Sequence, residues 1–95
     1  MKTTITIYTV TAKVYENGKL ADGYTEAQSY LERKQAIEFV MKNGIEIAQD
    51  YENGSYEIID LLGRHSGVIG GTYSLKVYNG GYLMVEYVIS EGILF

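Results

Sequence analysis

The stretch "KVYENGK", residues 13–19, decides how this 95-residue chain begins to fold. Asn-Gly between alternating residues is the strongest short-range signal for a β-hairpin, because both central residues of a type I′ turn need positive φ. A two-residue loop at Asn17 and Gly18 sets four pairs of residues opposite each other, and two of these pairs carry opposite charges. The pairs are Glu16–Lys19, Tyr15–Leu20, Val14–Ala21 and Lys13–Asp22. The sequence therefore predicts antiparallel strands over residues 3–16 and 19–30.

The same register divides this hairpin into two faces. One face is small and apolar, which suits a covering helix, and it holds Tyr8, Val10, Ala12, Val14, Ala21, Thr25 and Ala27. The other is expected to be the outer face, and it carries Tyr15, Tyr24 and Tyr30. The chain has ten tyrosines against two phenylalanines, and tyrosine is enriched in protein interfaces. These three tyrosines are therefore candidate partner-binding residues.

Two further stretches repeat the tyrosine and Asn-Gly pattern. "DYENGSY" at 50–56 predicts a hairpin of strands 45–51 and 55–62, in which Asp50 lies opposite Glu57. "KVYNGGY" at 76–82 predicts another, of strands 72–78 and 82–89, whose two glycines leave the register open. The final "EGILF" is expected to be a last edge strand or a plug, or a tail that seeks another chain.

The segment "ERKQAIEFVMKNG", residues 32–44, has the apolar spacing of an amphipathic helix. Ser29 and Glu32 have the spacing of a capping box, and Asn43-Gly44 is a typical helix end. A helix that continued to Gln49 would place Gly44 in its interior, at a cost of about 1 kcal/mol relative to alanine. The stop at Gly44 is the preferred interpretation.

The predicted order is ββ-α-ββ-ββ, an α+β single domain over residues 1–95. Its sheet is mostly antiparallel, built from three β-hairpins with one helix packed on it. The chain has no cysteine, which excludes disulfides and thiolate sites. It shows neither a secretory signal nor an apolar run long enough for a membrane helix. We expect a cytoplasmic protein without membrane contact.

Acidic residues are concentrated between residues 43 and 63, where five acids occur and no lysine or arginine. Four of them, Glu46, Asp50, Glu52 and Glu57, are candidate partner-binding residues. Three interpretations compete: a solvated acidic face, a divalent-cation site, and contact with a basic protein whose phosphate ligands the acids imitate. Oxygen ligands spread along flat strands fit a cation poorly, so no metal or other cofactor is expected. The acidity also argues against direct nucleic-acid binding.

The glycine-rich stretch "LGRHSGVIGGT", residues 62–72, contains Arg64, His65 and Ser66. It matches no nucleotide-binding pattern. His65 and Ser66 are adjacent, so on an extended backbone their side chains point apart, which is poor geometry for a base and its nucleophile. We interpret the stretch as a connector in which Arg64 is a candidate partner contact. A small hydrolase that uses this loop is the least favoured function.

Together these patterns predict a non-catalytic protein that docks on another protein. In size, acidity and tyrosine content the chain is similar to small acidic proteins of phages and mobile elements, including anti-CRISPR-type inhibitors. That resemblance covers no motif and transfers no residue. It implies an inhibitor that acts on a basic, nucleic-acid-handling partner. The alternative is a homodimeric structural module that pairs through strand edges.

Overall fold

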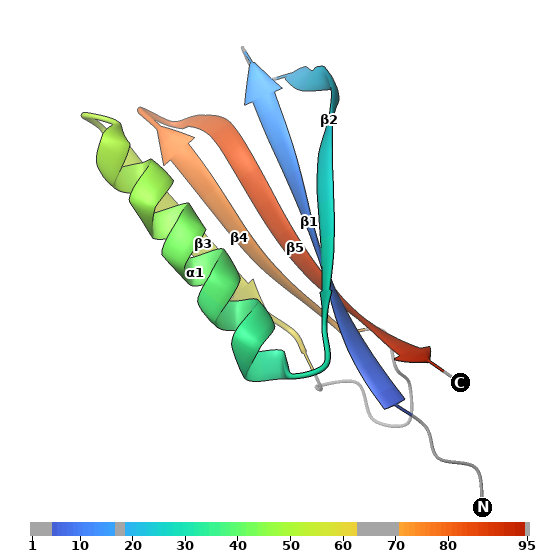
Figure 1. Ribbon diagram of the computed structural model, residues 1–95. Coiled ribbons are helices and arrows are strands. Elements are labelled where there is room, and N and C mark those ends of the chain that lie inside the picture. The colour runs from blue at the N-terminus through green and yellow to red at the C-terminus, as the bar shows by residue number, and fades with distance from the viewer. Residues whose placement is uncertain (1–4, 17–18, 63–70, 95) are drawn as a thin grey trace, which may run out of the picture.

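The computed structural model describes residues 5–16, 19–62 and 71–94, and of residues 22–27 and 93–94 it describes the backbone alone. The elements follow in the order β1 (Ile5–Glu16), β2 (Lys19–Tyr30), α1 (Arg33–Asp50), β3 (Gly54–Asp60), β4 (Thr72–Asn79) and β5 (Tyr82–Leu94). Within the described chain the strands form one antiparallel sheet with the order β2-β1-β5-β4-β3. Helix α1 covers one face of that sheet (Figure 1). The predicted α+β class is confirmed.

The core lies between α1 and the sheet. The helix buries small residues four positions apart, namely Ala36, Val40, Gly44 and Ala48, so they form one strip along its length. The strip packs on alternate residues of three strands, β1, β4 and β5, which together bury Val10, Ala12, Tyr73, Leu75, Val77, Val85, Tyr87 and Ile89. Burying this apolar area is the main stabilising contribution to the fold.

The predicted end of the helix at Gly44 is wrong, since α1 continues to Asp50. A side chain at Gly44 would collide with Leu75, which is fully buried beneath it. The glycine therefore lets the helix lie close to the sheet, and the packing gained on Leu75 offsets its poor helix propensity. Residues 45–51 are consequently not a strand. The observed order is ββ-α-βββ, and the predicted second hairpin does not exist.

The first hairpin agrees with its predicted register only next to the turn. Glu16 lies opposite Lys19 and Tyr15 opposite Leu20, but Lys13 then lies opposite Thr25 rather than Asp22. Between these pairs β1 contributes one residue and β2 contributes four. An odd offset moves every later side chain of a strand to the other face. The predicted Val14–Ala21 and Lys13–Asp22 pairs are wrong, and so are the predicted faces of Gln28 and Tyr30.

The β4–β5 hairpin confirms the third turn. Asn79 lies opposite Tyr82, and Gly80 and Gly81 both have positive φ, 59° and 90°, as a type I′ turn requires. Strand β5 then pairs with β1 as far as Leu94 opposite Ile5. The C-terminal residues 91–94 therefore belong to β5 and pair with β1, so they form neither a separate last strand nor a free tail. Among the described residues, no helix is long and apolar enough to cross a membrane.

Candidate protein-binding edge

Among the described strands, β3 forms one edge of the sheet and pairs on one side only, with β4. Its apolar side chains are exposed on both of its faces. Tyr56 (47% exposed) and Ile58 (37%) lie on the face toward α1, Ile59 (43%) lies on the opposite face, and Leu61 (43%) directly follows the strand. Natural edge strands usually carry charges, proline or bulges that prevent further pairing. The chain has no proline, and β3 pairs with β4 without a bulge. Its two charges are engaged within the chain, because Glu57 lies opposite Lys76 and Asp60 contacts Arg33.

The helix extends this apolar edge. Ile45 lines an open groove of about 520 Å³ between the end of α1 and the start of β3. Met41 lies one turn earlier on the same side of the helix and is 36% exposed. We define the β3 edge surface as Met41, Ile45, Tyr56, Ile58, Ile59 and Leu61.

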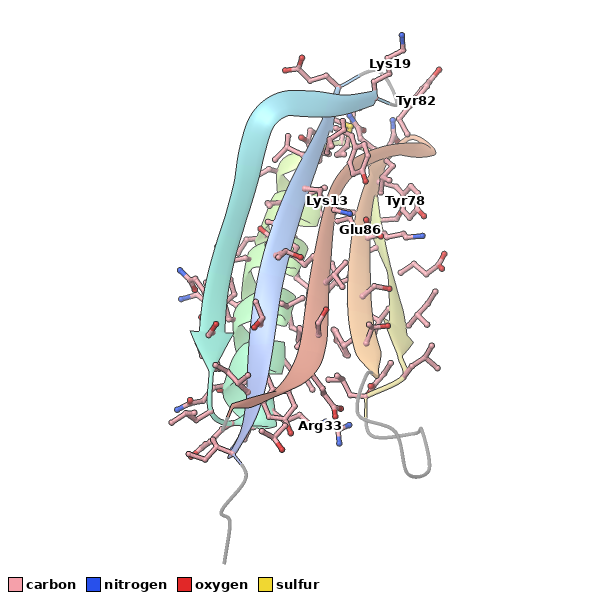
Figure 2. The ribbon with its side chains drawn as sticks, turned by 90° about the vertical axis from the view of Figure 1, so that its right-hand side faces the viewer. Lys13, Lys19, Arg33, Tyr78, Tyr82 and Glu86 are labelled. Atoms are coloured by element: carbon pink, nitrogen blue, oxygen red, sulfur yellow. The ribbon has the colours of Figure 1, made fainter. Side chains whose placement is uncertain are left out.

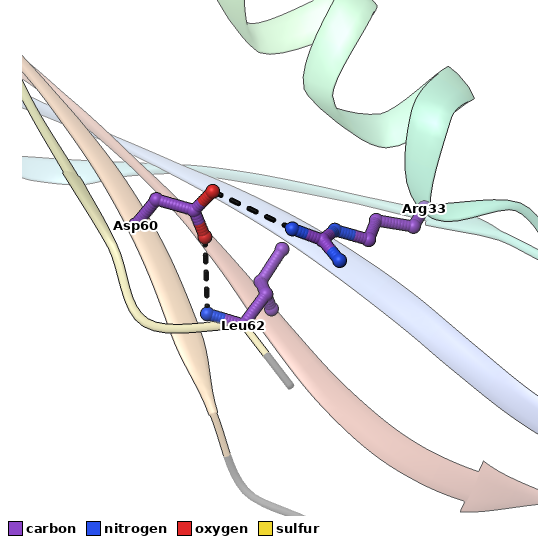
Figure 3. A network of polar contacts seen from close by, with 3 residues as sticks. All are labelled: Arg33, Asp60 and Leu62. Atoms are coloured by element: carbon purple, nitrogen blue, oxygen red, sulfur yellow. Dashed lines mark hydrogen bonds and ion pairs between the residues drawn. The ribbon is translucent and has the colours of Figure 1, made fainter. Parts of the chain in front are cut away.

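Polar contacts hold the far end of β3 against the start of the helix (Figure 3). Arg33 Nη2 lies 3.5 Å from Asp60 Oδ2, and the Leu62 backbone N–H donates to Asp60 Oδ1 at 3.1 Å. At the other end, Gly54 lies directly against the Ala48 carbonyl. Strand β3 is thus in contact with α1 at both ends.

The structure disperses the four candidate acids. Glu46 and Asp50 are exposed on α1, Glu52 is exposed in the turn after it, and Glu57 lies on the sheet face away from the helix, opposite Lys76. The predicted Asp50–Glu57 cross-strand pair does not exist, because Asp50 is helical. The predicted acidic hairpin is therefore wrong as a single surface.

The three candidate tyrosines also lie apart. Tyr15 is on the outer face, where its hydroxyl donates to Glu86 Oε1 at 3.4 Å. Partial burial, and then the Glu86 carboxylate, raise the pKa of Tyr15 above its ordinary 10.0. Tyr30 lies on the helix side, with its ring 5.9 Å from that of Phe39. Its predicted place on the outer face is therefore wrong, for the register reason given above. The side chain of Tyr24 lies outside the described atoms.

The sheet face away from α1 carries a row of alternating charge that crosses four strands. In the register of the sheet, Lys13 of β1 neighbours Glu86 of β5, which neighbours Lys76 of β4, which neighbours Glu57 of β3. Figure 2 looks onto this face and shows Lys13 beside Glu86 with the helix behind the sheet. Such cross-strand pairs stabilise a sheet by about 0.2–1 kcal/mol each. The row has two positive and two negative side chains, as expected of a solvated outer surface.

Arg64, His65 and Ser66 lie outside the described residues, as do all of residues 63–70 of the predicted connector 62–72. Among the residues that the structure does describe, no group of three or more histidine, aspartate or glutamate side chains could hold a metal ion. Comparisons of the chain with protein-family models, with curated proteins and with solved structures found no match.

Sequence reasoning missed the β3 edge surface. The signal was the run "YEIIDLL", residues 56–62, in which Ile58 and Ile59 are adjacent. Adjacent apolar residues in a strand point to opposite faces, so one of the two had to lie on the side that the helix does not cover. Met41 and Ile45 could not be included while residues 45–51 were assigned to a strand.

Proposed function

We propose that this chain is a non-catalytic protein that acts by binding proteins, and that the β3 edge surface is where it binds. One observation carries the proposal: β3 is an edge strand of the described sheet that has neither proline nor a bulge and exposes apolar side chains on both faces. An extended segment that adds to such an edge gains main-chain hydrogen bonds, while its side chains fill the flanking apolar sites. The groove beside Ile45 and Tyr56 provides one of those sites.

The test compares two matched substitutions on opposite edges of the sheet. Ile58→Lys places a charge in the β3 edge surface, and Leu20→Lys makes the same kind of change on β2, where Leu20 is 52% exposed. Tagged wild-type and variant proteins are used to capture partners from the cells that produce the chain. Each retained protein is then purified, and its affinity is measured by calorimetry. We expect Ile58→Lys to abolish binding and Leu20→Lys to preserve it. Equal binding by the two variants would refute the β3 edge as the site.

A second candidate function uses the acids at the end of α1. The helix has bases, Arg33 and Lys34, in its first turn, and it has Asp50 with no base in its last turn. This order runs against the helix dipole, which favours acids at the start and bases at the end. Stability alone does not favour such an arrangement. It supports the sharper proposal of an anti-defence inhibitor in the cytoplasm, similar to anti-CRISPR proteins, that contacts a basic nucleic-acid-handling partner.

The combined change Glu46→Gln, Asp50→Asn and Glu52→Gln tests this second candidate. If the acids contact a basic partner, the triple variant associates more slowly and its binding depends less on salt. Glu38→Gln, which removes an exposed charge elsewhere on the same helix, is the control and should leave both quantities unchanged. Unchanged salt dependence in the triple variant would exclude these acids as the contact.

A further inference from the structure

We infer that the partner of the β3 edge surface is a second copy of this chain, bound by antiparallel pairing of β3 with β3 about a two-fold axis. The inference rests on the proposed function, since it names the partner of the same surface. It predicts one continuous sheet through both copies, with the two helices side by side on the same face. Four features of the described residues support it.

The first feature is the direction of the backbone groups of β3. The Leu61 backbone N–H donates to the Thr72 carbonyl at 2.8 Å, so Leu61 directs its main-chain groups toward β4. Because these groups alternate in direction along a strand, Glu57 and Ile59 also face β4, whereas Tyr56 and Ile58 direct theirs outward. A second β3 would meet these outward groups with its own.

The second feature is the register that two-fold symmetry allows. Residues that lie opposite each other in a sheet share a face, so a two-fold axis must place one residue of β3 opposite the same residue of the second copy. Near the middle of the strand this residue can be Tyr56, Glu57 or Ile58. An axis at Glu57 would oppose two carboxylates in the middle of β3, which is unfavourable, whereas an axis at Tyr56 brings Asp60 toward Glu52 of the second copy only where the strand ends. An axis at Tyr56 places the two Tyr56 residues together and sets Ile58 opposite Gly54 of the second copy. We assign this register.

The third feature is the groove at the end of the helix. It is lined by Ile45, Ala48, Gln49, Tyr51, Gly54, Ser55 and Tyr56. Gly54 has no side chain, so Ile58 of the second copy would project into this groove and cover its apolar lining. By symmetry the same contact forms twice. An aliphatic side chain that is 37% exposed in one copy thereby becomes an interface anchor.

The fourth feature is the match between the helices. The Arg33–Asp60 and Ala48–Gly54 contacts fix the ends of β3 against α1. The helix and β3 run side by side, with Gly54 beside Ala48 and Asp60 beside Arg33. Tyr56 lies one third of the way from Gly54 to Asp60, so it is level with the helix residue one third of the way from Ala48 to Arg33, which is Asn43. An axis there sets Met41 opposite Ile45 of the second copy.

The same axis brings Glu52 of the second copy to the level of Asp60, where Arg33 and Lys34 at the start of the helix supply two positive charges against the two carboxylates. The helix packs on β3 and β4, so the two helices would lie on the order of 10 Å apart, the usual spacing of packed helices.

The mass of the chain in solution is the first test. Sedimentation equilibrium of the wild type should give twice the 10.6 kDa of one chain. Ile58→Lys should raise the dissociation constant by about 100-fold, as loss of a buried interface anchor does, while Leu20→Lys should not change it. Circular dichroism verifies that both variants are folded. A monomeric wild type at submillimolar concentration would overturn the inference.

Disulfide cross-linking tests the register, because the chain has no cysteine of its own. In Tyr56→Cys the two introduced residues lie opposite each other at about 5.5 Å between Cα atoms, which a disulfide can span. In Ile58→Cys the two introduced residues are offset by four positions along the strands, which places their Cα atoms about 14 Å apart. We expect a cross-linked dimer from Tyr56→Cys alone. Cross-linking of Ile58→Cys alone would contradict the assigned register.

Failure of this inference is distinguishable from failure of the proposed function. A monomeric wild type whose capture of another protein is lost in Ile58→Lys would retain the binding edge and exclude the second copy. A dimer that persists in Ile58→Lys would show that the β3 edge surface is not the interface between the two copies.

Discussion

The tetrapeptide YENG occurs twice in this chain, at residues 15–18 and 51–54, with two different structural results. In the first copy Tyr15 and Glu16 end β1, and Glu16 pairs with Lys19 at the start of β2. In the second copy Tyr51 caps the end of α1 and Gly54 begins β3. The preceding residues make the difference: an alternating strand leads into the first copy, and the small-residue strip of a helix leads into the second. A short turn motif is therefore subordinate to the element that precedes it.

The glycine of the second copy is required for a different reason than the glycines of a hairpin turn. Gly80 and Gly81 have positive φ, and a β-carbon at either position would meet no other atom within 4 Å, so the backbone angle alone calls for glycine. Gly54 has no positive φ, but a side chain there would overlap the Ala48 carbonyl. Close contact between the helix end and β3 calls for glycine at this position.

Substitution of Gly54 should have the largest effect. Gly54→Ala and Gly54→Asn both force the end of α1 away from β3, and we expect each to lower the free energy of unfolding by about 3 kcal/mol, the upper end of the usual cost of overpacking. Urea denaturation measures the effect. A loss in Gly54→Asn much smaller than in Gly54→Ala would show that backbone angle, and not contact, selects this glycine.

Substitution of Gly81 should have a smaller effect and a different order. Gly81→Ala places a β-carbon at positive φ, for about 1–2 kcal/mol. Gly81→Asn should cost less than Gly81→Ala, because asparagine tolerates the left-handed region. The same denaturation series gives both values. Equal losses for alanine and asparagine here would remove the distinction between the two kinds of glycine.

The acids on either side of the second YENG should respond with opposite signs. Asp50→Asn removes a negative charge at the end of α1 and should stabilise the protein by about 0.3–1 kcal/mol. Glu57→Gln removes the carboxylate opposite Lys76 and should destabilise it by about 0.2–0.5 kcal/mol. Thermal unfolding at low salt measures both. Stabilisation by both changes would instead favour the hairpin that the sequence predicted, in which these acids repel each other.

The tyrosine of the first YENG should contribute the smallest effect, visible at high pH. Partial burial and Glu86 raise the pKa of Tyr15 in the folded state above 10.0, so the unfolded chain releases this proton first. The resulting stability is complete below pH 10 and is lost as the pH rises above it.

Two variants test this expectation for Tyr15. Tyr15→Phe should make the decline of stability above pH 10 shallower. Glu86→Gln should do so in part, since Glu86 is only the second cause of the shift. An unchanged slope in Tyr15→Phe would contradict the assignment.

Part of this fold could be predicted from the sequence and part could not. The α+β class, the first helical turns and the Glu16–Lys19 pairing follow from local patterns that the fold preserves. The extension of α1 does not, because the partner that makes Gly44 favourable is Leu75, which is distant in the sequence and had no assigned position. The face of Tyr30 was inverted by an irregularity in β2 that no turn signal marks. Of the candidate site, the adjacent Ile58 and Ile59 were visible in the sequence, but their place at an edge depends on the strand order.

Amide hydrogen exchange along β3 tests the central claim most directly, namely that this edge is open to strand pairing. The exchange rates are measured by NMR at low and at high protein concentration. We predict that the Glu57, Ile59 and Leu61 amides are protected at both concentrations by β4, whereas the Tyr56 and Ile58 amides exchange rapidly when dilute and become protected when concentrated. Rapid exchange of Tyr56 and Ile58 at both concentrations would show that no second copy pairs with the edge. Full protection of both amides in the dilute monomer would contradict the open edge itself.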